Sequence, residues 1–255
     1  MVTYLSRDAW GARPPKAGPG ELVASRVDGV VIHWPGTSSP NPITSMAGVA
    51  SALRGWQAFH MNPEPQGRGW SDIAYQVAVD QAGRAWMLRG FRIQSGANGN
   101  EELNQRYGAI LLILVKGEEP SAAMKATVRE LVGHFRKIYP GATAVLPHSQ
   151  VRPDGTDCPG PAAAAALERG DFTPATSPTK DDDMWTPEQA EKIEKRYTMA
   201  HQLWLAQTAA ERAVSDALAA KLLAAGKTPA EAIAEVEKIW APIQRTQAEG
   251  LDRLT

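Results

Sequence analysis

One cysteine and two histidines carry the clearest chemical potential in this sequence. Cys158 is the only cysteine among 255 residues, and His148 lies ten positions before it in a loop rich in proline and glycine. Residues 28–34 form a short β-branched run that stops at a Pro-Gly pair, which places His33 at the C-terminal end of a buried strand. Thiolate and neutral imidazole are preferred zinc ligands, and three protein ligands with a fourth position left open is the arrangement of catalytic zinc. The three side chains are therefore a candidate zinc site.

The same residues allow a second chemistry. Cys158 could be a nucleophile with His148 as its base, because an Ala-rich helix starting just after the cysteine would lower the pKa of the thiol. This arrangement leaves His33 without a role. We interpret the remaining histidines as structural: His60, His134 and His201.

The elements that would position these residues alternate between strands and helices. Apolar side chains recur at helical spacing in two segments, the second of which is capped by Ser121 and stopped by a Pro-Gly pair. Two apolar-rich runs around a short glycine-containing loop predict a hairpin, and one uninterrupted apolar run predicts a central strand covered on both faces. The expected elements are helices at 43–61 and 121–139, hairpin strands at 72–79 and 84–89 and a strand at 107–115, with an irregular leader at 5–15 and a loop at 95–106. This pattern predicts an α/β domain with a mixed central sheet flanked by helices.

Composition changes along the chain predict three parts. A catalytic domain is expected at residues 1–171, a flexible linker at 172–183 and an all-α C-terminal module at 184–255. The linker contains prolines, threonines and three consecutive aspartates, which bury too little apolar surface to become ordered. In the module, capping boxes at Thr186 and Thr228 predict two helices. Two helices bury little alone, so the module is expected to dock on a partner or to self-associate.

Charge and cysteine usage narrow the function classes. The formal net charge is −1, which predicts neither nucleic acid nor an anionic membrane as a partner. A single cysteine forms no internal disulfide. The N-terminus has no basic start followed by an apolar core, and the longest apolar run, residues 109–115, is too short to span a bilayer. We therefore expect a cytosolic protein with no signal peptide.

Several motifs occur in the order found in one family. The sequence resembles the zinc-dependent N-acetylmuramoyl-L-alanine amidases, a family that includes peptidoglycan recognition proteins and phage amidase endolysins. The resemblance covers roughly residues 5–170 and rests on SRDAWGARPP (6–15), VIH (31–33), GWSDIAYQ (69–76), DQAGR (80–84), LRG (88–90) and TDCPG (156–160).

The resemblance implies a site and a reaction. The zinc ligands of the family fall on His33, His148 and Cys158, and its tyrosine near the metal falls on Tyr75. The implied activity is cleavage of the amide between N-acetylmuramic acid and L-alanine by a zinc-activated water. We expect Tyr75 to stabilise the oxyanion and Thr156 to assist it by hydrogen bonding. Next to the cysteine, Asp157 is expected to orient a ligand histidine.

Some positions depart from the family pattern and concern the substrate groove. Asn98 replaces a histidine in a Gly-Ala-His turn, and Trp34 stands where a smaller or polar residue is common. We assign Trp34, Arg89 and Asn98 to substrate binding. A protein that only binds peptidoglycan is a third possibility, although family members of that kind commonly lack the ligand cysteine.

The absence of a signal peptide, together with the linker and the extra module, resembles a phage endolysin. Such a protein would be held in the cytoplasm of the infected host and would act on the cell wall after release through a membrane lesion. The C-terminal helices would then target the wall or form an oligomer.

Overall fold

The computed structural model describes residues 2–16, 20–36, 41–152 and 155–174, and scattered positions between 218 and 235. The chain divides into two compact units, residues 1–178 and 179–255. In the second unit the predicted capping box is present, because the Thr228 backbone N–H donates to Glu231 Oε2 at 2.8 Å. The rest of the predicted helical module lies outside the described residues. No helix within the described residues is both long and apolar enough to cross a membrane.

One mixed sheet forms the centre of the first unit. Its strands in the described chain lie in the order β1-β4-β3-β5-β2-β6. β3 and β4 form an antiparallel hairpin, whereas the other neighbouring strands pair in parallel. The strands are β1 (Thr3–Leu5), β2 (Gly29–His33), β3 (Val77–Val79), β4 (Arg84–Met87), β5 (Tyr107–Leu112) and β6 (Ala144–Pro147). The predicted mixed sheet and its hairpin are confirmed.

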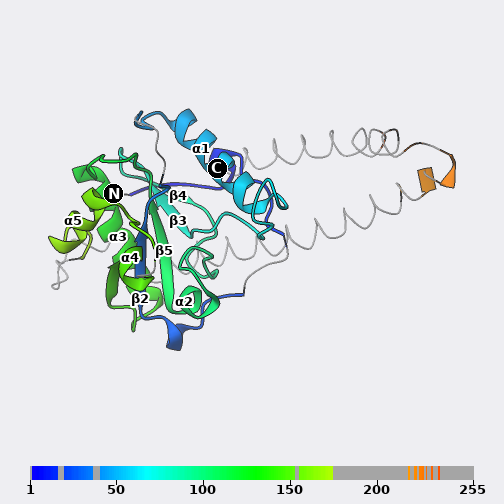
Figure 1. Ribbon diagram of the computed structural model, residues 1–255. Coiled ribbons are helices and arrows are strands. Elements are labelled where there is room, and N and C mark those ends of the chain that lie inside the picture. The colour runs from blue at the N-terminus through cyan, green and yellow to red at the C-terminus, as the bar shows by residue number, and fades with distance from the viewer. Residues whose placement is uncertain are drawn as a thin grey trace. The chain divides into compact units, whose positions relative to one another are not determined.

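Helices cover both faces of this sheet (Figure 1). α1 and its apolar contacts lie on one face, and α3 and α5 pack on the other. The Ser121 hydroxyl accepts from the Met124 backbone N–H at 3.0 Å and caps α3 as predicted. The helices are α1 (Met46–Met61), α2 (Glu101–Arg106), α3 (Ala122–Ile138), α4 (His148–Val151) and α5 (Pro161–Glu168), with short 3-10 turns at Asp8–Trp10 and Ala24–Arg26.

The alternation of side chains along the strands decides which face carries the chemistry. Val30 and Ile32 of β2 pack in the core cluster beneath α3 and α5. Successive strand residues point to opposite faces, so His33 points to the face that α1 covers. Tyr75 packs against the cluster on that same face. Both side chains therefore lie on one side of the sheet, His33 at the C-terminal end of β2 and Tyr75 two residues before β3.

Two polar segments predicted to be irregular are partly regular. Residues 101–106, expected as a loop, form α2, because Asn100 Oδ1 accepts from the Leu103 backbone N–H at 2.9 Å and two glutamates occupy the first turn. The leader contains a 3-10 turn and follows β1, which pairs with β4. Trp10 of this leader is fully buried on the domain.

The first unit also extends further along the chain than the sequence indicates. Phe172, assigned to the linker, is fully buried in the core cluster that α3 supplies. Arg129 donates to the Asp171 backbone carbonyl at 2.7 Å, and Lys125 pairs with the Asp171 carboxylate at 2.9 Å. Asp171 and Phe172 therefore belong to the packed first unit.

Replacing Phe172 with alanine in the full chain is expected to lower the free energy of unfolding by about 3–5 kcal/mol, because it leaves a cavity in the core. Phe59→Ala is the matched control, since Phe59 is 49% exposed, and should cost less than about 1 kcal/mol. Urea denaturation of the two variants measures both values. Equal, small effects would show that residue 172 belongs to the linker.

Candidate metal centre

The three predicted ligand residues meet at one edge of the sheet. One ligand atom from each of His33, His148 and Cys158 lies within 4.8 Å of the others. β2 and β6 are parallel neighbours with Ile32 opposite Pro147, so the residues that follow, His33 and His148, emerge side by side. The Ser149 backbone N–H donates to the Cys158 carbonyl at 2.8 Å and ties the cysteine loop to α4. Parallel pairing thus joins residues far apart in the sequence.

The donor atoms fit zinc in kind and in spacing. His33 Nδ1 lies 3.6 Å from Cys158 Sγ. Two ligands on a tetrahedral zinc ion, one bound through nitrogen and one through sulfur, are about 3.6 Å apart at the usual bond lengths. The His148 Nε2 atom is buried and has no hydrogen-bond partner within the described residues. A buried polar atom without a partner is costly, so an unpaired nitrogen in this cluster points to a bound ligand.

The protonation states in this cluster suit metal binding better than cysteine catalysis. Burial, followed by the nearby His148 ring, lowers the pKa of His33 to about 3. Burial also lowers the pKa of His148, so both rings are neutral and have a free lone pair near neutral pH. Burial raises the pKa of the Cys158 thiol to about 12. A nucleophilic cysteine needs a lowered thiol pKa. The N-terminus of α5 was expected to lower the pKa of Cys158, but burial raises it by more.

Two residues assigned to substrate binding lie behind the site. Trp34 is buried, and its ring lies so close to Gly160 that a Cβ there would come within 3.2 Å of it. Trp34 therefore supports the cysteine loop from behind. Arg89 is also buried, and its guanidinium donates to the backbone carbonyls of Ile73 at 2.6 Å and Gln94 at 2.7 Å. Both side chains pack inside the domain, and their assignment to substrate binding stays a prediction.

Asn98 is the third residue assigned to the groove, and it is fully buried as well. Its Oδ1 atom lies 2.9 Å from His33 Nε2. The expected orienting residue, Asp157, is exposed, and its backbone carbonyl accepts from Gly160. The group that holds a ligand histidine is therefore the Asn98 amide, not the Asp157 carboxylate.

Tyr75 and Thr156 lie beside the cluster. The Tyr75 and His33 ring centroids are 5.4 Å apart, edge to face. Burial, followed by the nearby Cys158, raises the pKa of Tyr75, so its hydroxyl remains a proton donor. Thr156 Oγ1 accepts from the Cys158 backbone N–H at 3.2 Å, which leaves the hydroxyl proton available to a further acceptor. Both residues are placed where they can assist chemistry at the metal.

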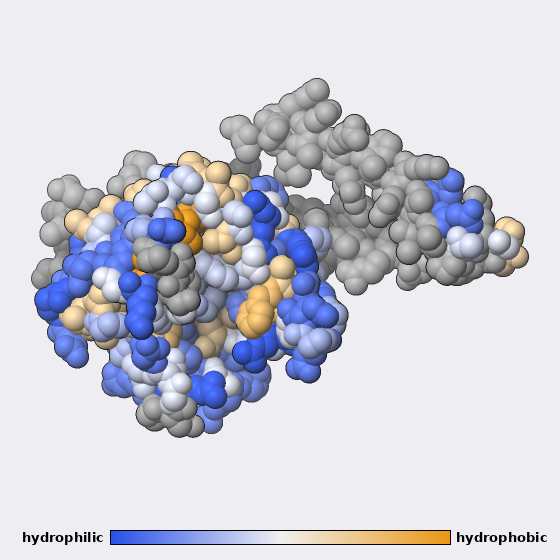
Figure 2. All heavy atoms as spheres, turned by 45° about the horizontal axis from the view of Figure 1, so that its top comes forward, coloured by the Kyte–Doolittle hydropathy of each residue, from blue (hydrophilic) through white to orange (hydrophobic). Residues whose placement is uncertain are grey.

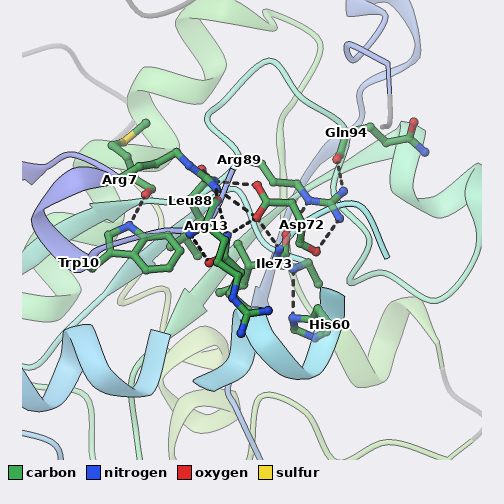
Figure 3. A network of polar contacts seen from close by, with 12 residues as sticks. Arg7, Trp10, Arg13, His60, Asp72, Ile73, Leu88, Arg89 and Gln94 are labelled. Atoms are coloured by element: carbon green, nitrogen blue, oxygen red, sulfur yellow. Dashed lines mark hydrogen bonds and ion pairs between the residues drawn. The ribbon is translucent and has the colours of Figure 1, made fainter. Parts of the chain in front are cut away.

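A buried polar network supports the segment that carries Tyr75, and sequence reasoning missed it (Figure 3). The Asp72 carboxylate accepts from Arg7 at 2.7 Å and from Gln57 Nε2 at 2.7 Å. It also accepts from the Ile73 backbone N–H at 2.8 Å. Arg7 lies in the N-terminal leader and Gln57 on α1, so three distant segments converge on this carboxylate. The Gly-Trp-Ser-Asp motif marks Asp72 in the sequence, although its partners are visible only in the fold.

Exposed aromatic side chains lie around His60, whose ring centroid is 6.0 Å from that of Tyr75. The His60 ring stacks on Trp70, with centroids 5.1 Å apart and planes 5° from parallel. The Arg68 guanidinium lies 5.4 Å from the Phe59 ring and 5.9 Å from the Trp70 ring. Phe59 and Trp70 are exposed large hydrophobic side chains. The face of the molecule drawn in Figure 2 is mostly hydrophilic, with scattered hydrophobic residues. The sequence patterns did not identify this aromatic group, which is connected to the candidate metal centre through His60 and Tyr75.

The remaining histidines do not join the metal cluster in the described chain. His60 Nδ1 accepts from the Ala74 backbone N–H at 3.4 Å. His134 packs edge-on against Phe91 with ring centroids 4.6 Å apart. His201 lies outside the described residues. His60 and His134 therefore have packing roles, as interpreted from the sequence.

Comparison with solved structures shows which known proteins share this fold. No protein-family model matches the sequence, and no curated protein matches it. Among solved structures, Drosophila PGRP-LB is 25% identical, with 70% of this chain and 100% of that chain covered and a TM-score of 0.56. A point variant of Drosophila PGRP-LB in complex with tracheal cytotoxin is 26% identical, with coverage of 68% and 96% and a TM-score of 0.56. The chain therefore has a fold like that of the peptidoglycan recognition proteins.

A further structural neighbour is similar in fold alone. Peptidoglycan recognition protein-LE, in complex with tracheal cytotoxin, is 24% identical over 67% of this chain and 95% of that chain, with a TM-score of 0.55. Its bound ligand is described as a monomeric diaminopimelic acid-type peptidoglycan.

The half-buried His60 predicts a specific pH dependence of stability. Burial, then Arg89 and Arg68, lower its pKa to about 4, below the value of about 6.5 in an unfolded chain. The unfolded state therefore takes up a proton first as the pH falls, and the contribution of neutral His60 is present above about pH 6.5 and lost towards pH 4. Between about pH 7 and pH 5, wild-type protein should lose about 1–2 kcal/mol more stability than His60→Asn.

Asparagine is chosen because its Oδ1 atom can still accept from the Ala74 N–H. Urea denaturation at several pH values measures the difference. Parallel stability curves for the two proteins would contradict the lowered pKa of His60.

Proposed function

We propose that this protein is a zinc-dependent N-acetylmuramoyl-L-alanine amidase. The observation that carries the proposal is the complete cluster of His33, His148 and Cys158 with the Tyr75 ring directly beside it. Support comes from the similarity in fold to peptidoglycan recognition proteins, some of which were solved with tracheal cytotoxin bound. The substrate would be bacterial peptidoglycan, cut between N-acetylmuramic acid and L-alanine.

The residues of this chain have distinct parts in the proposed reaction. Zinc, when bound, would supply a Lewis acid that polarises the amide carbonyl and lowers the pKa of a water molecule. Neutral His33 and His148 provide lone pairs, while Cys158 must lose its proton on binding zinc. Tyr75 keeps its proton and would donate a hydrogen bond to the oxyanion that develops on the carbonyl oxygen. Thr156 would provide a second, weaker donor at the loop.

A protein that only binds peptidoglycan is the main alternative. It would use the same groove without needing an intact set of metal ligands. All three candidate ligands are present here and their ligand atoms lie within 4.8 Å of one another, which favours catalysis. The cysteine hydrolase is disfavoured, since burial raises the pKa of the Cys158 thiol to about 12.

The biological setting is a further part of this proposal. We retain the endolysin role, in which the protein accumulates in the host cytoplasm and reaches the wall after release. The C-terminal module would then target the wall or cause self-association. Sedimentation and wall binding of the full chain, compared with a chain lacking residues 184–255, separate these two roles.

Removing the metal is expected to abolish activity. A chelator should stop the release of new L-alanine amino termini from purified peptidoglycan, and added zinc should restore it. Cys158→Ser should lower both zinc content and release, because a serine hydroxyl is a poor zinc ligand compared with a thiolate. Amino termini released at an unchanged rate in the chelator would contradict the proposal, whereas wall binding without any release by zinc-loaded protein would support the binding-only alternative.

Tyr75→Phe isolates the oxyanion donor. The change removes one hydroxyl and should lower kcat by about 10²–10³-fold while zinc content stays at the wild-type level. Thr156→Val tests the weaker donor and should have a smaller effect. An unchanged kcat for Tyr75→Phe would exclude the hydroxyl from the reaction.

A further inference from the structure

We propose that Asn98 is a positioning residue that selects which ring nitrogen His33 presents to the metal. The inference rests on the proposed zinc site and concerns a residue of this chain that sequence reasoning assigned to the groove. Asn98 lies in the loop that precedes α2 and is fully buried. It therefore acts on the ligands from behind, where substrate does not reach.

The orientation of the Asn98 amide follows from its neighbours. Its Nδ2 atom lies 2.8 Å from the Tyr107 carbonyl oxygen and 3.3 Å from that of Leu103. Carbonyl oxygens only accept hydrogen bonds, so the side of the amide that faces them must be the NH₂ group. A flipped amide would bring oxygen against oxygen in a buried site. The Oδ1 atom therefore faces His33.

This fixed amide determines the tautomer of His33. Oδ1 is an acceptor only, and it lies 2.9 Å from His33 Nε2, so Nε2 must carry the ring proton. In a neutral ring the other nitrogen, Nδ1, then has the lone pair. Nδ1 is the atom that lies 3.6 Å from Cys158 Sγ. The hydrogen bond to Asn98 thus directs the His33 lone pair into the metal cluster.

The second histidine lies beside the first. The His33 and His148 ring centroids are 4.5 Å apart, and His148 Nε2 is buried without a hydrogen-bond partner in the described part of the chain. With the His33 proton fixed on Nε2, Nδ1 of His33 and Nε2 of His148 are the two ring nitrogens left for one ion.

Asn98 is itself held in place by α2. Asn104 Oδ1 accepts from the Asn98 backbone N–H at 2.9 Å, and it lies 3.3 Å from the Ser95 hydroxyl. Ser95 Oγ in turn accepts from Asn98 Nδ2 at 3.1 Å. The amide, the hydroxyl and the helix form a closed set of hydrogen bonds. A set of this kind restricts the side chain to one rotamer, and so restricts the ring of His33.

Two measurements test this role without using catalytic activity. Long-range ¹H–¹⁵N correlation spectra of metal-free wild-type protein distinguish the tautomers of each histidine. We expect the Nε2–H form for His33. An Nδ1–H form for His33 would overturn the inference, and this result does not depend on any variant folding.

Zinc affinity is the second measurement, made by competition with a chromophoric chelator. Asn98→Leu has a similar volume and lacks the hydrogen bonds, so it should weaken zinc binding by about 10- to 100-fold. The matched control is Gln105→Met, which removes a neighbouring amide on α2 that bonds Gln94 and not a ligand histidine. Its zinc affinity should stay within about twofold of the wild-type value.

The outcomes separate this inference from the proposed function. Wild-type protein that binds zinc, together with Asn98→Leu of unchanged affinity, would overturn the role of Asn98 alone. Wild-type protein that binds no zinc would overturn the proposed function. Weaker binding by Asn98→Leu but not by Gln105→Met supports the inference.

Discussion

A buried imidazole must have a partner for both of its nitrogen atoms, and the site is built around this requirement at His33. The ring is only 1% exposed, so water cannot supply either partner. Asn98 satisfies Nε2, and Nδ1 faces Cys158 and the proposed metal position. Burial also keeps the ring neutral, since it lowers the pKa of His33 to about 3. Burial therefore has two effects on His33. It makes an unpaired ring nitrogen costly, and it keeps the ring neutral, so that a nitrogen lone pair is available to a metal ion.

The sheet and its supports bring the other groups to that ring. The parallel register of β2 and β6 sets His148 beside His33, and the close approach of Trp34 to Gly160 holds the loop that carries Cys158. Gly160 has φ of +82°, a conformation that glycine adopts readily, so the position needs glycine for both its backbone and its space. On the other side, the Asp72 network fixes the segment that ends in Tyr75. Each reactive side chain is thus positioned by a part of the fold that lies outside the groove.

Local patterns in the sequence were sufficient to predict the main elements and the three side chains that meet in the candidate metal cluster. Each of these signals lies within one short stretch of the sequence. They are the β-branched run before His33, the apolar stripe and cap of α3, and the single cysteine. The role of Asn98 could not be predicted in this way, because its partners come from β2, α2 and β5. Trp34 and Arg89 were assigned to substrate binding from their positions in the sequence. Their burial and their contacts with Gly160, Ile73 and Gln94 are visible only in the fold. Phe172 is a further example, since the average composition of its segment predicts a linker while the Phe172 side chain is buried in the core.

The most direct test of the central claim is X-ray absorption at the zinc edge of the metal-loaded protein. The account predicts one sulfur at about 2.3 Å, from Cys158, two histidine nitrogens at about 2.0–2.1 Å and one further light atom. A first shell of four nitrogen or oxygen atoms without sulfur would contradict it, because Cys158 would then not be a ligand. A shell with more than one sulfur would contradict it as well, since the chain contains a single cysteine.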